Sequence, residues 1–156
     1  MIKKALVKDV KAMQELINFY AKQDKMLLRS LNELYENVRD FFVYKENDEI
    51  LGCVALHVSW EDLAEIKSLA VKESMHRKKI GTSLVETALK DAKALDVKRV
   101  FALTYVPEFF ERFGFRRVEH SELPHKVWSE CIKCVKFPNC DEIAVVKDIK
   151  QMGHNA

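Results

Sequence analysis

The sequence predicts an α/β fold, a mixed sheet with helices on its faces, in the order β-α-α-β-β-β-α-β-α-β-β. Three observations support this fold class. Two segments with apolar residues at helical spacing follow a first short strand, and three strand-like stretches occupy the middle of the chain. The last of these stretches gives way to a helix at a basic loop near residue 80. The sheet is therefore expected to contain one strand-to-helix crossover near its middle.

The first half of the chain is predicted to form a strand, two helices and a hairpin. Residues 1–8 are interpreted as the strand. Asp9 is the predicted cap of the first helix, and Ser30 and Glu33 have the spacing of a capping box that starts the second. Apolar residues follow these caps at helical spacing, namely Val10, Met13, Leu16, Ile17 and Tyr20, then Leu31, Leu34, Tyr35 and Val38. Residues 41–45 and 50–60 are predicted strands joined by the polar turn 47–49.

The second half is predicted to alternate strands and helices. Residues 63–71 form a strand, and a helix with one apolar stripe begins at Gly81. The stripe consists of Leu84, Val85, Ala88, Leu89, Ala92 and Leu95. After a strand over residues 98–104, Pro107 suits the first turn of a short helix that Gly114 ends. Residues 115–118 and 142–146 are the last predicted strands.

Composition limits the class of protein. A chain of 156 residues, 48% of them hydrophobic, can bury the core of one domain, which we expect over residues 1–150 with a flexible tail at 151–156. With 26 basic and 24 acidic residues the net charge is +2, which does not indicate a nucleic-acid partner. The apolar runs are too short for a membrane span or a secretory signal, so we expect a cytoplasmic protein that binds no membrane. The composition does not decide whether the chain forms a homodimer.

The basic loop is the first candidate binding site. His76, Arg77, Lys78 and Lys79 place four basic or potentially basic side chains where a helix begins. Helix N-termini carry positive partial charge and normally attract acidic side chains, so a cationic cluster there indicates that an anion is bound. A pyrophosphate would satisfy both the helix and the cations. The alternative is an ordinary solvated basic loop.

Three segments of the sequence together resemble the GNAT acetyltransferases: residues 64–71, the loop 76–81 before its helix, and residues 107–115. The resemblance spans most of the chain and implies acetyl-CoA as the donor. It implies that Leu69, Ala70 and Val71 offer backbone groups to the pantetheine arm. It also implies cofactor contacts from the loop and from the short helix, through His76, Arg77, Lys78, Lys79, Ile80, Gly81, Thr82 and Phe110.

The loop departs from the pattern of that family at two key positions. The family has Arg or Gln, two free positions, Gly, one free position, then Gly or Ala. Here these places hold His76, Lys79 and Gly81. Lys79 is compatible with the pattern if its backbone is right-handed, and its ammonium adds charge where phosphate would lie.

Residues 27–43 and 122–142 resemble the short N-acetylglutamate synthases, which lack an amino-acid kinase domain. This resemblance implies acetylation of the α-amino group of L-glutamate, the first step toward arginine. Two alternatives remain. The chain could acetylate another small amine, a peptide N-terminus or a lysine, or it could be a non-catalytic module that binds acyl-CoA or senses metal.

Acetyl transfer needs a base for the amine, donors for the oxyanion and a proton for the leaving thiolate. Glu65 matches the position at which some members of the family keep a glutamate base, and its alternative is a surface carboxylate paired with Lys67. The oxyanion would meet a backbone N–H near Leu69 or Ala70. Many members have a tyrosine where this chain has Phe109 or Phe110, so Tyr105 is the candidate acid; water could also protonate the thiolate.

The two carboxylates of glutamate require at least one guanidinium and a second donor set. Arg29 and Ser30, at the start of the second predicted helix, are the leading candidates, and Lys67 is a further one. Arg39 and Arg112 are weaker choices, because each could be an ordinary charge on a helix surface.

Cysteines form a separate cluster near the C-terminus. Cys131, Cys134 and Cys140 have the pattern C-x2-C-x5-C, and His125 lies six residues upstream. Together they could bind a structural Zn²⁺, although the thiols could also stay reduced or form a redox-labile Cys131–Cys134 pair. Cys53 lies in an apolar strand and is expected in the core.

Overall fold

The computed structural model describes residues 1–123 and 142–149, and the element order agrees with the predicted one. The helices are α1 (Val10–Ala21), α2 (Leu31–Glu36), α3 (Ile80–Ala94) and α4 (Pro107–Glu111). The strands are β1 (Ile2–Lys4), β2 (Phe41–Glu46), β3 (Glu49–Trp60), β4 (Leu63–Val71), β5 (Arg99–Thr104), β6 (Arg116–Val118) and β7 (Ile143–Asp148). Short 3-10 turns are η1 (Val7–Asp9), η2 (Val38–Asp40), η3 (Glu73–Lys78) and η4 (His120–Glu122).

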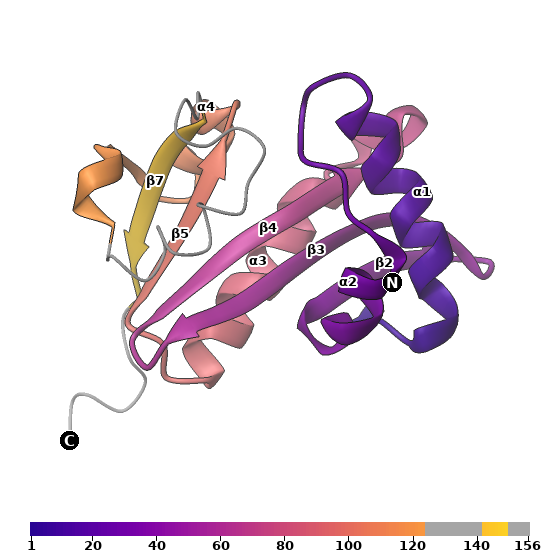
Figure 1. Ribbon diagram of the computed structural model, residues 1–156, viewed down its shortest axis with the longest axis horizontal. Helices are drawn as coiled ribbons and strands as arrows, with labels where there is room; N and C mark the ends of the chain where they lie inside the picture. Colours follow the sequence, from indigo (N-terminus) through magenta and orange to yellow (C-terminus); the bar gives the residue numbers. More distant parts are fainter. Residues whose placement is uncertain (124–141, 150–156) are drawn as a thin grey trace.

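The strands form one sheet in the order β1-β2-β3-β4-β5-β7-β6 (Figure 1). Neighbouring strands are antiparallel except β4 and β5, which are parallel and joined through α3. This is the predicted strand-to-helix crossover, and the predicted hairpin of β2 and β3 is present beside it. Asn47 and Asp48 turn that hairpin with positive φ angles of 51° and 63°, a conformation that these two residue types tolerate.

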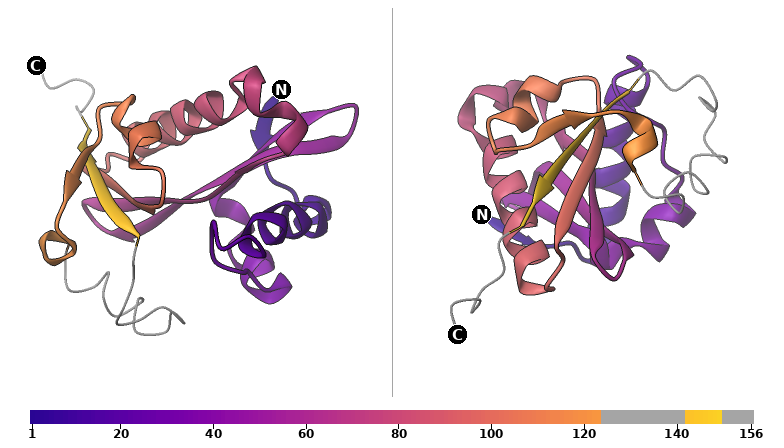
Figure 2. Two further views of the ribbon diagram at one scale, coloured as in Figure 1. Left: turned by 90° about the horizontal axis from the view of Figure 1, so that it is seen from above. Right: turned by 90° about the vertical axis from the view of Figure 1, so that its left-hand side faces the viewer.

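Helices cover the two faces of the sheet separately (Figure 2). On one face α3 packs through Leu84, Val85 and Ala88 against the strands. On the other face α1 and α2 pack against the part of the sheet that Cys53, Ala55 and Ala70 present. A third cluster, formed by Leu63, Phe101, Leu123, Ala144 and Val146, fills the region where β4, β5 and β7 meet.

Local details of the first helices differ from the prediction. Asp9 does not cap α1 with its side chain. Its carboxylate instead accepts the N–H of Leu6 at 2.8 Å and binds the Lys45 ammonium at 2.8 Å, which pins η1 to the sheet. Ser30 does cap α2, accepting the Glu33 N–H at 3.0 Å. Tyr35, predicted on the apolar face of α2, is 38% exposed, whereas Leu34 in the same short helix is buried.

The later elements show smaller differences. Leu95 lies just beyond the end of α3 and is 53% exposed, so it does not extend the buried stripe. Strand β7 begins at Ile143 and runs on to Asp148, two residues past the predicted end. In the described part of the chain, no helix combines the length and the apolar character needed to cross a membrane. The predicted tail at 151–156 lies outside the described residues.

Candidate active site

The strands β4 and β5 pair over only part of their length. Their register joins Leu63 to Arg99, Ala64 to Val100 and Glu65 to Phe101, and beyond these pairs the two strands diverge toward their carboxyl ends (Figure 1). Backbone groups on the β5 side of the second half of β4 are thus left for another partner. The carboxyl ends of parallel strands are where α/β sheets bind ligands.

A bulge in β4 lies in its second half, where β5 no longer pairs with it. Cys53 pairs with Ala70, but Ala55 pairs with Lys67, so β4 contains one residue more than β3 between these pairs. Ser68 in the bulge has a φ of 56°, and its carbonyl accepts the Cys53 thiol at 3.4 Å. Bulges re-aim side chains and end pairing, and here the bulge directly precedes the segment 69–71 predicted to bind the cofactor.

The loop after β4 contains a residue with a strained backbone conformation. Lys79 has φ 59° and ψ 23°, a left-handed conformation, so the condition under which a lysine would fit the family pattern, a right-handed backbone, is not met. Four of the six described non-glycine residues with positive φ are Asp or Asn. Of the other two, Ser68 directly precedes the predicted cofactor segment 69–71, and Lys79 lies within the basic loop that is also predicted to bind the cofactor. Such conformations gather at functional sites. The structure therefore explains why a glycine suits this loop position.

The N-terminus of α3 meets both β4 and α4. A side chain at Gly81 would lie 3.7 Å from Val71 and 3.7 Å from the Phe109 ring, so glycine leaves room between these elements. Helix α3 spans Ile80–Ala94, and the first N–H groups of any helix have no partner within it. Lys78 and Lys79 are exposed beside this end, whereas Ile80 is buried; Thr82 is partly buried, and the side chain of Arg77 is not described.

His76 braces the loop from the side of α1. Its Nε2 lies 2.6 Å from the Tyr20 hydroxyl and 3.0 Å from the Val71 carbonyl. The Tyr20 hydroxyl also donates to the Val71 carbonyl, and the two rings stack with centroids 5.9 Å apart. The imidazole thus ties the end of β4 to α1. The sequence predicted His76 for cofactor contact but did not predict its partner Tyr20.

The candidate catalytic residues lie on one face of the sheet. Ala64 and Ile66 belong to the core on the α3 side, so strand alternation places Glu65 and Lys67 on the face covered by α1 and α2. By the same alternation Tyr105, which follows β5, shares the face of Phe101, the residue paired with Glu65. Glu65 and Lys67 are partly buried.

Phe110, predicted to contact the cofactor, is only 5% exposed and belongs to the core on the α3 side. Its ring packs edge-on against Phe115 and Phe109, with centroids 5.3 Å from each. Phe109, by contrast, is partly buried and lies next to Gly81. Of the two aromatic residues of α4, Phe109 is thus the one that faces the N-terminus of α3.

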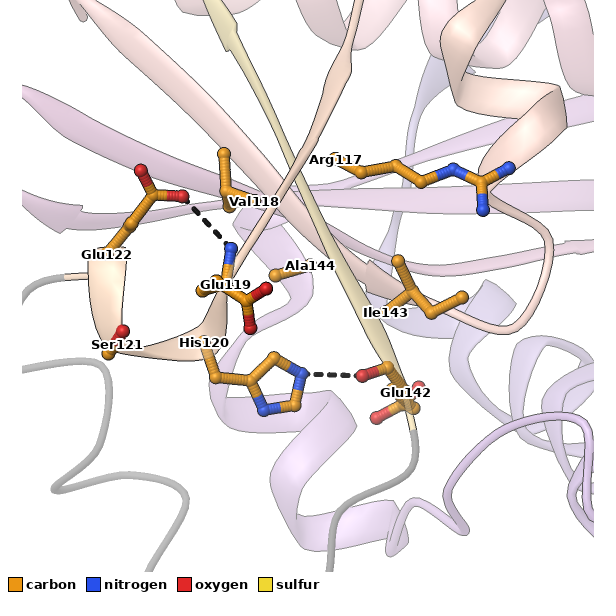
Figure 3. Close-up of a pocket in the computed structure, with 9 residues that line it drawn as sticks. All are labelled: Arg117, Val118, Glu119, His120, Ser121, Glu122, Glu142, Ile143 and Ala144. Atoms are coloured by element: carbon orange, nitrogen blue, oxygen red, sulfur yellow. Dashed lines mark hydrogen bonds between the residues drawn. The ribbon is translucent and has the colours of Figure 1, made fainter.

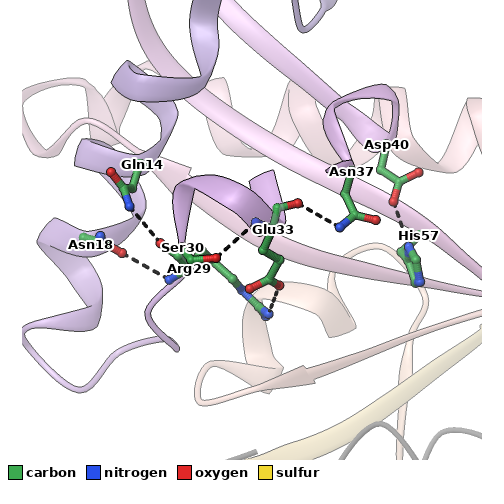
Figure 4. A network of polar contacts seen from close by, with 8 residues as sticks. All are labelled: Gln14, Asn18, Arg29, Ser30, Glu33, Asn37, Asp40 and His57. Atoms are coloured by element: carbon green, nitrogen blue, oxygen red, sulfur yellow. Dashed lines mark hydrogen bonds and ion pairs between the residues drawn. The ribbon is translucent and has the colours of Figure 1, made fainter. Parts of the chain in front are cut away.

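Arg29 stands at the entrance to α2 in a network of polar contacts (Figure 4). Its backbone is fixed by Gln14, which donates to its carbonyl at 3.1 Å, and by Asn18, which accepts its N–H at 3.3 Å. Its guanidinium pairs with Glu33 through Nη1 at 2.7 Å. The side chain is 20% exposed, and its buried Nε has no hydrogen-bond partner among the described residues.

A hydrogen-bonded pair that the sequence did not predict, Asp40 and His57, lies near the end of this network. The His57 Nδ1 is 2.7 Å from Asp40 Oδ2, and the two side chains are 26% and 27% exposed (Figure 4). His57 sits in β3 directly opposite Glu65 in β4. Residues 40 and 57 are separated by a hairpin strand, so no local pattern marks them as partners.

A described hollow lies elsewhere on the molecule. A pocket of about 720 Å³ is lined by residues of β6, η4 and β7 (Figure 3). Its lining includes Glu119, Glu122 and Glu142, and His120 donates through Nε2 to the Glu142 carbonyl at 2.6 Å. Three carboxylates make this pocket a poor receptor for a pyrophosphate, and it contains none of the residues predicted for cofactor or catalysis.

The cysteine prediction is tested only in part. His125, Cys131, Cys134 and Cys140 lie outside the described residues, and within residues 1–123 and 142–149 no group of three metal-binding side chains occurs. Cys53 is buried as expected, and burial raises the pKa of its thiol to about 12.

Comparison with known proteins gives a consistent result. Residues 7–115 match the Acetyltransferase (GNAT) family. An uncharacterised N-acetyltransferase of Chlorobaculum tepidum is 38% identical over 148 residues, which cover 95% of this chain and 96% of that protein. An amino-acid acetyltransferase of Mycobacterium tuberculosis is 39% identical over 133 residues, which cover 83% of this chain and 75% of that protein.

A solved structure is similar over nearly the whole chain. The crystal structure of a Mycobacterium tuberculosis protein in complex with CoA superposes with a TM-score of 0.85 at 32% identity. The superposition covers 96% of this chain and 99% of that one.

Proposed function

Because this chain belongs to the GNAT acetyltransferase family, as its motifs predicted, we propose that it acetylates the α-amino group of an amino acid, L-glutamate, in the first step toward arginine. The chain is an acetyl-CoA-dependent N-acetyltransferase of this family. Its similarity to a Mycobacterium tuberculosis enzyme named amino-acid acetyltransferase supports an amino acid as the acceptor. The resemblance of residues 27–43 and 122–142 to the N-acetylglutamate synthases supports glutamate.

The residues present fit the CoA donor. Helix α3 offers free N–H groups and positive partial charge, and Lys78 and Lys79 add two exposed ammonium groups beside them. Residues 69–71 follow the bulge on a strand edge that β5 does not pair. We assign the pyrophosphate to the first site and the pantetheine arm to the second. Bound acetyl-CoA supplies an activated acetyl group on a good leaving thiolate.

Catalysis in this proposal uses residues on the face that α1 and α2 cover. Glu65 removes a proton from the acceptor ammonium, directly or through water, so that the neutral amine can attack. A backbone N–H near Leu69 or Ala70 stabilises the developing oxyanion. Tyr105, on the same face at the end of β5, is the candidate donor of a proton to the leaving thiolate, and it replaces the tyrosine that α4 lacks.

The single observation that supports the choice of acceptor is the buried Nε of Arg29, which has no hydrogen-bond partner among the described residues. A buried donor without a partner costs about 1–3 kcal/mol, so this site favours a ligand that supplies an acceptor. A carboxylate that binds the Nε edge of the guanidinium would satisfy the buried donor, while Glu33 holds the other edge in place. Polyamines and lysine side chains have no carboxylate and would leave the donor unpaired.

The test is thiol release from acetyl-CoA with L-glutamate, L-glutamine, spermidine and a lysine peptide offered separately. We expect release with glutamate above all, and N-acetylglutamate as the product by mass. The variant Arg29→Lys keeps the positive charge but loses the planar set of N–H donors of the guanidinium. In this variant we expect the KM for glutamate to rise about 10- to 100-fold. The matched control is Arg99→Met, since Arg99 pairs with Asp148 at the surface. Turnover only with spermidine or peptide would refute the acceptor assignment.

A further inference from the structure

The Asp40–His57 pair has a defined protonation pattern. An ionised carboxylate can only accept hydrogen bonds, so the His57 Nδ1 that lies 2.7 Å from Asp40 carries a proton and donates it. In the neutral imidazole the other nitrogen, Nε2, is then the basic one. A carboxylate that fixes the tautomer and raises the basicity of a histidine is a recurrent arrangement in active sites.

The register of the sheet places this base beside Glu65. His57 in β3 and Glu65 in β4 are directly opposed, and opposed residues of antiparallel strands have Cβ atoms about 4.5–5.5 Å apart. Their side chains share one face, the face covered by α1 and α2. Lys67, which pairs with Ala55, is the diagonal neighbour of His57 on β4 and places a further charged group on this face of the described sheet.

The arrangement of Glu65, His57 and Asp40 could serve to carry the proton of the substrate away from the site. The acceptor arrives as an ammonium, and the reaction releases one proton to solvent for each amide formed. As the proposed base, Glu65 must give up that proton before the next turnover, and the carboxylate of a glutamate has an ordinary pKa of about 4.3. Histidine, with an ordinary pKa of about 6.5, is better matched to neutral pH.

We propose that His57, oriented by Asp40, is the positioning residue through which Glu65 loses the substrate proton. The proposal rests on Glu65 being the base of the proposed function. The ammonium gives a proton to the Glu65 carboxylate, Glu65 gives it to Nε2 of His57, and the imidazolium returns it to solvent. The Asp40 carboxylate stabilises the imidazolium stage.

The experiment measures kcat and kcat/KM against pH for the wild type, His57→Gln and Asp40→Asn. We expect His57→Gln to lower kcat at pH 7 by about 100-fold, with the KM for both substrates within about twofold. Asp40→Asn keeps the imidazole without its carboxylate. It is expected to lower kcat by about tenfold and to move the acidic limb of the profile to lower pH, because the imidazolium is less stabilised.

Chemical rescue separates this role from a structural one. Added imidazole should restore a large part of the rate of His57→Ala and none of the rate of Glu65→Gln. His120→Gln is the matched control, since His120 binds a carbonyl at the β7 end and is expected to leave the profile unchanged. Thermal melts of each variant confirm folding, and Asp40→Asn carries the test if His57→Ala does not fold.

Unchanged kcat and pH profile in His57→Gln and Asp40→Asn would overturn the proposal, and so would a loss of rate in folded His57→Ala that imidazole does not restore. Failure of the proposed function would give a different result, because the wild type itself would not acetylate glutamate. The pH profiles of the same variants would then be measured with the amine that the wild type does accept.

Discussion

Replacing Lys79 by glycine tests the strained loop directly. Lys79 is left-handed, with φ 59° and ψ 23°, at the junction of η3 and α3. Glycine adopts this conformation without steric cost. Lys78, the preceding residue, is also an exposed lysine but does not have a positive φ. Lys78→Gly and Lys79→Gly therefore remove the same charge and differ in what they do to the backbone.

The expected magnitudes have opposite signs. A left-handed conformation costs an L-residue about 1–2 kcal/mol, and glycine loses about 0.5–1 kcal/mol through its greater freedom in the unfolded chain. Lys79→Gly is therefore expected to stabilise the fold by about 0.5–1 kcal/mol, a rise in Tm of about 1–4 °C. Lys78→Gly gains nothing from relief of strain and is expected to destabilise by about 0.5–1 kcal/mol.

Thermal denaturation followed by circular dichroism measures these changes, and initial rates give the KM for acetyl-CoA. Each variant loses one ammonium near the proposed pyrophosphate site, so we expect similar and modest increases in that KM. If Lys79→Gly destabilises as much as Lys78→Gly does, the strain at Lys79 is absent and the explanation of the family pattern fails.

Two further predictions concern stability, and a third concerns the reactivity of a thiol. Burial acts to raise the pKa of Asp9, but its bonds to Lys45 and to a backbone N–H outweigh this and hold the pKa below the usual 3.8. The stabilisation of the fold by ionised Asp9 is therefore complete above about pH 4 and is lost as pH falls through the native pKa. Measured by urea unfolding, the variant Asp9→Asn should be about 3 kcal/mol less stable than the wild type at pH 7. On acidification the variant should lose less stability than the wild type does. Gly52→Ala would place a Cβ 3.0 Å from Leu84 and should cost about 1–3 kcal/mol by the same assay; a neutral result would contradict the close packing of α3 on β3. The thiol of Cys53, with its pKa near 12, should resist alkylation at pH 8 in native protein and react after unfolding, and peptide mapping showing rapid native labelling would refute its burial.

The order of helices and strands could be predicted because each element has its own periodicity. Apolar residues at helical spacing marked α1 and α3 before any long-range contact was considered. The capping role given to Asp9 was wrong because its carboxylate is satisfied by Leu6 and by Lys45, which lies 36 residues away in β2. A local pattern contains no information on such a partner.

The same limit applied to the site. The basic loop was recognisable from its place between a strand and a helix start, and Glu65 from the resemblance to the GNAT acetyltransferases. The bulge at Ser68, the left-handed Lys79 and the bond between His76 and Tyr20 depend on how β4 pairs with β3 and how α1 packs on the sheet. His57 was missed because its significance comes from Asp40 in η2 and from the register that places it opposite Glu65.

The proposal that this acetyltransferase acts on glutamate is tested most directly by one competition reaction. Purified protein is mixed with acetyl-CoA and equal concentrations of L-glutamate, L-glutamine, spermidine and a lysine peptide, and all acetylated products are identified by mass. We predict N-acetylglutamate as the main product, and its loss when Arg29→Lys replaces the wild type. Preferential acetylation of spermidine or the peptide, unaffected by the Arg29 substitution, would contradict the proposal.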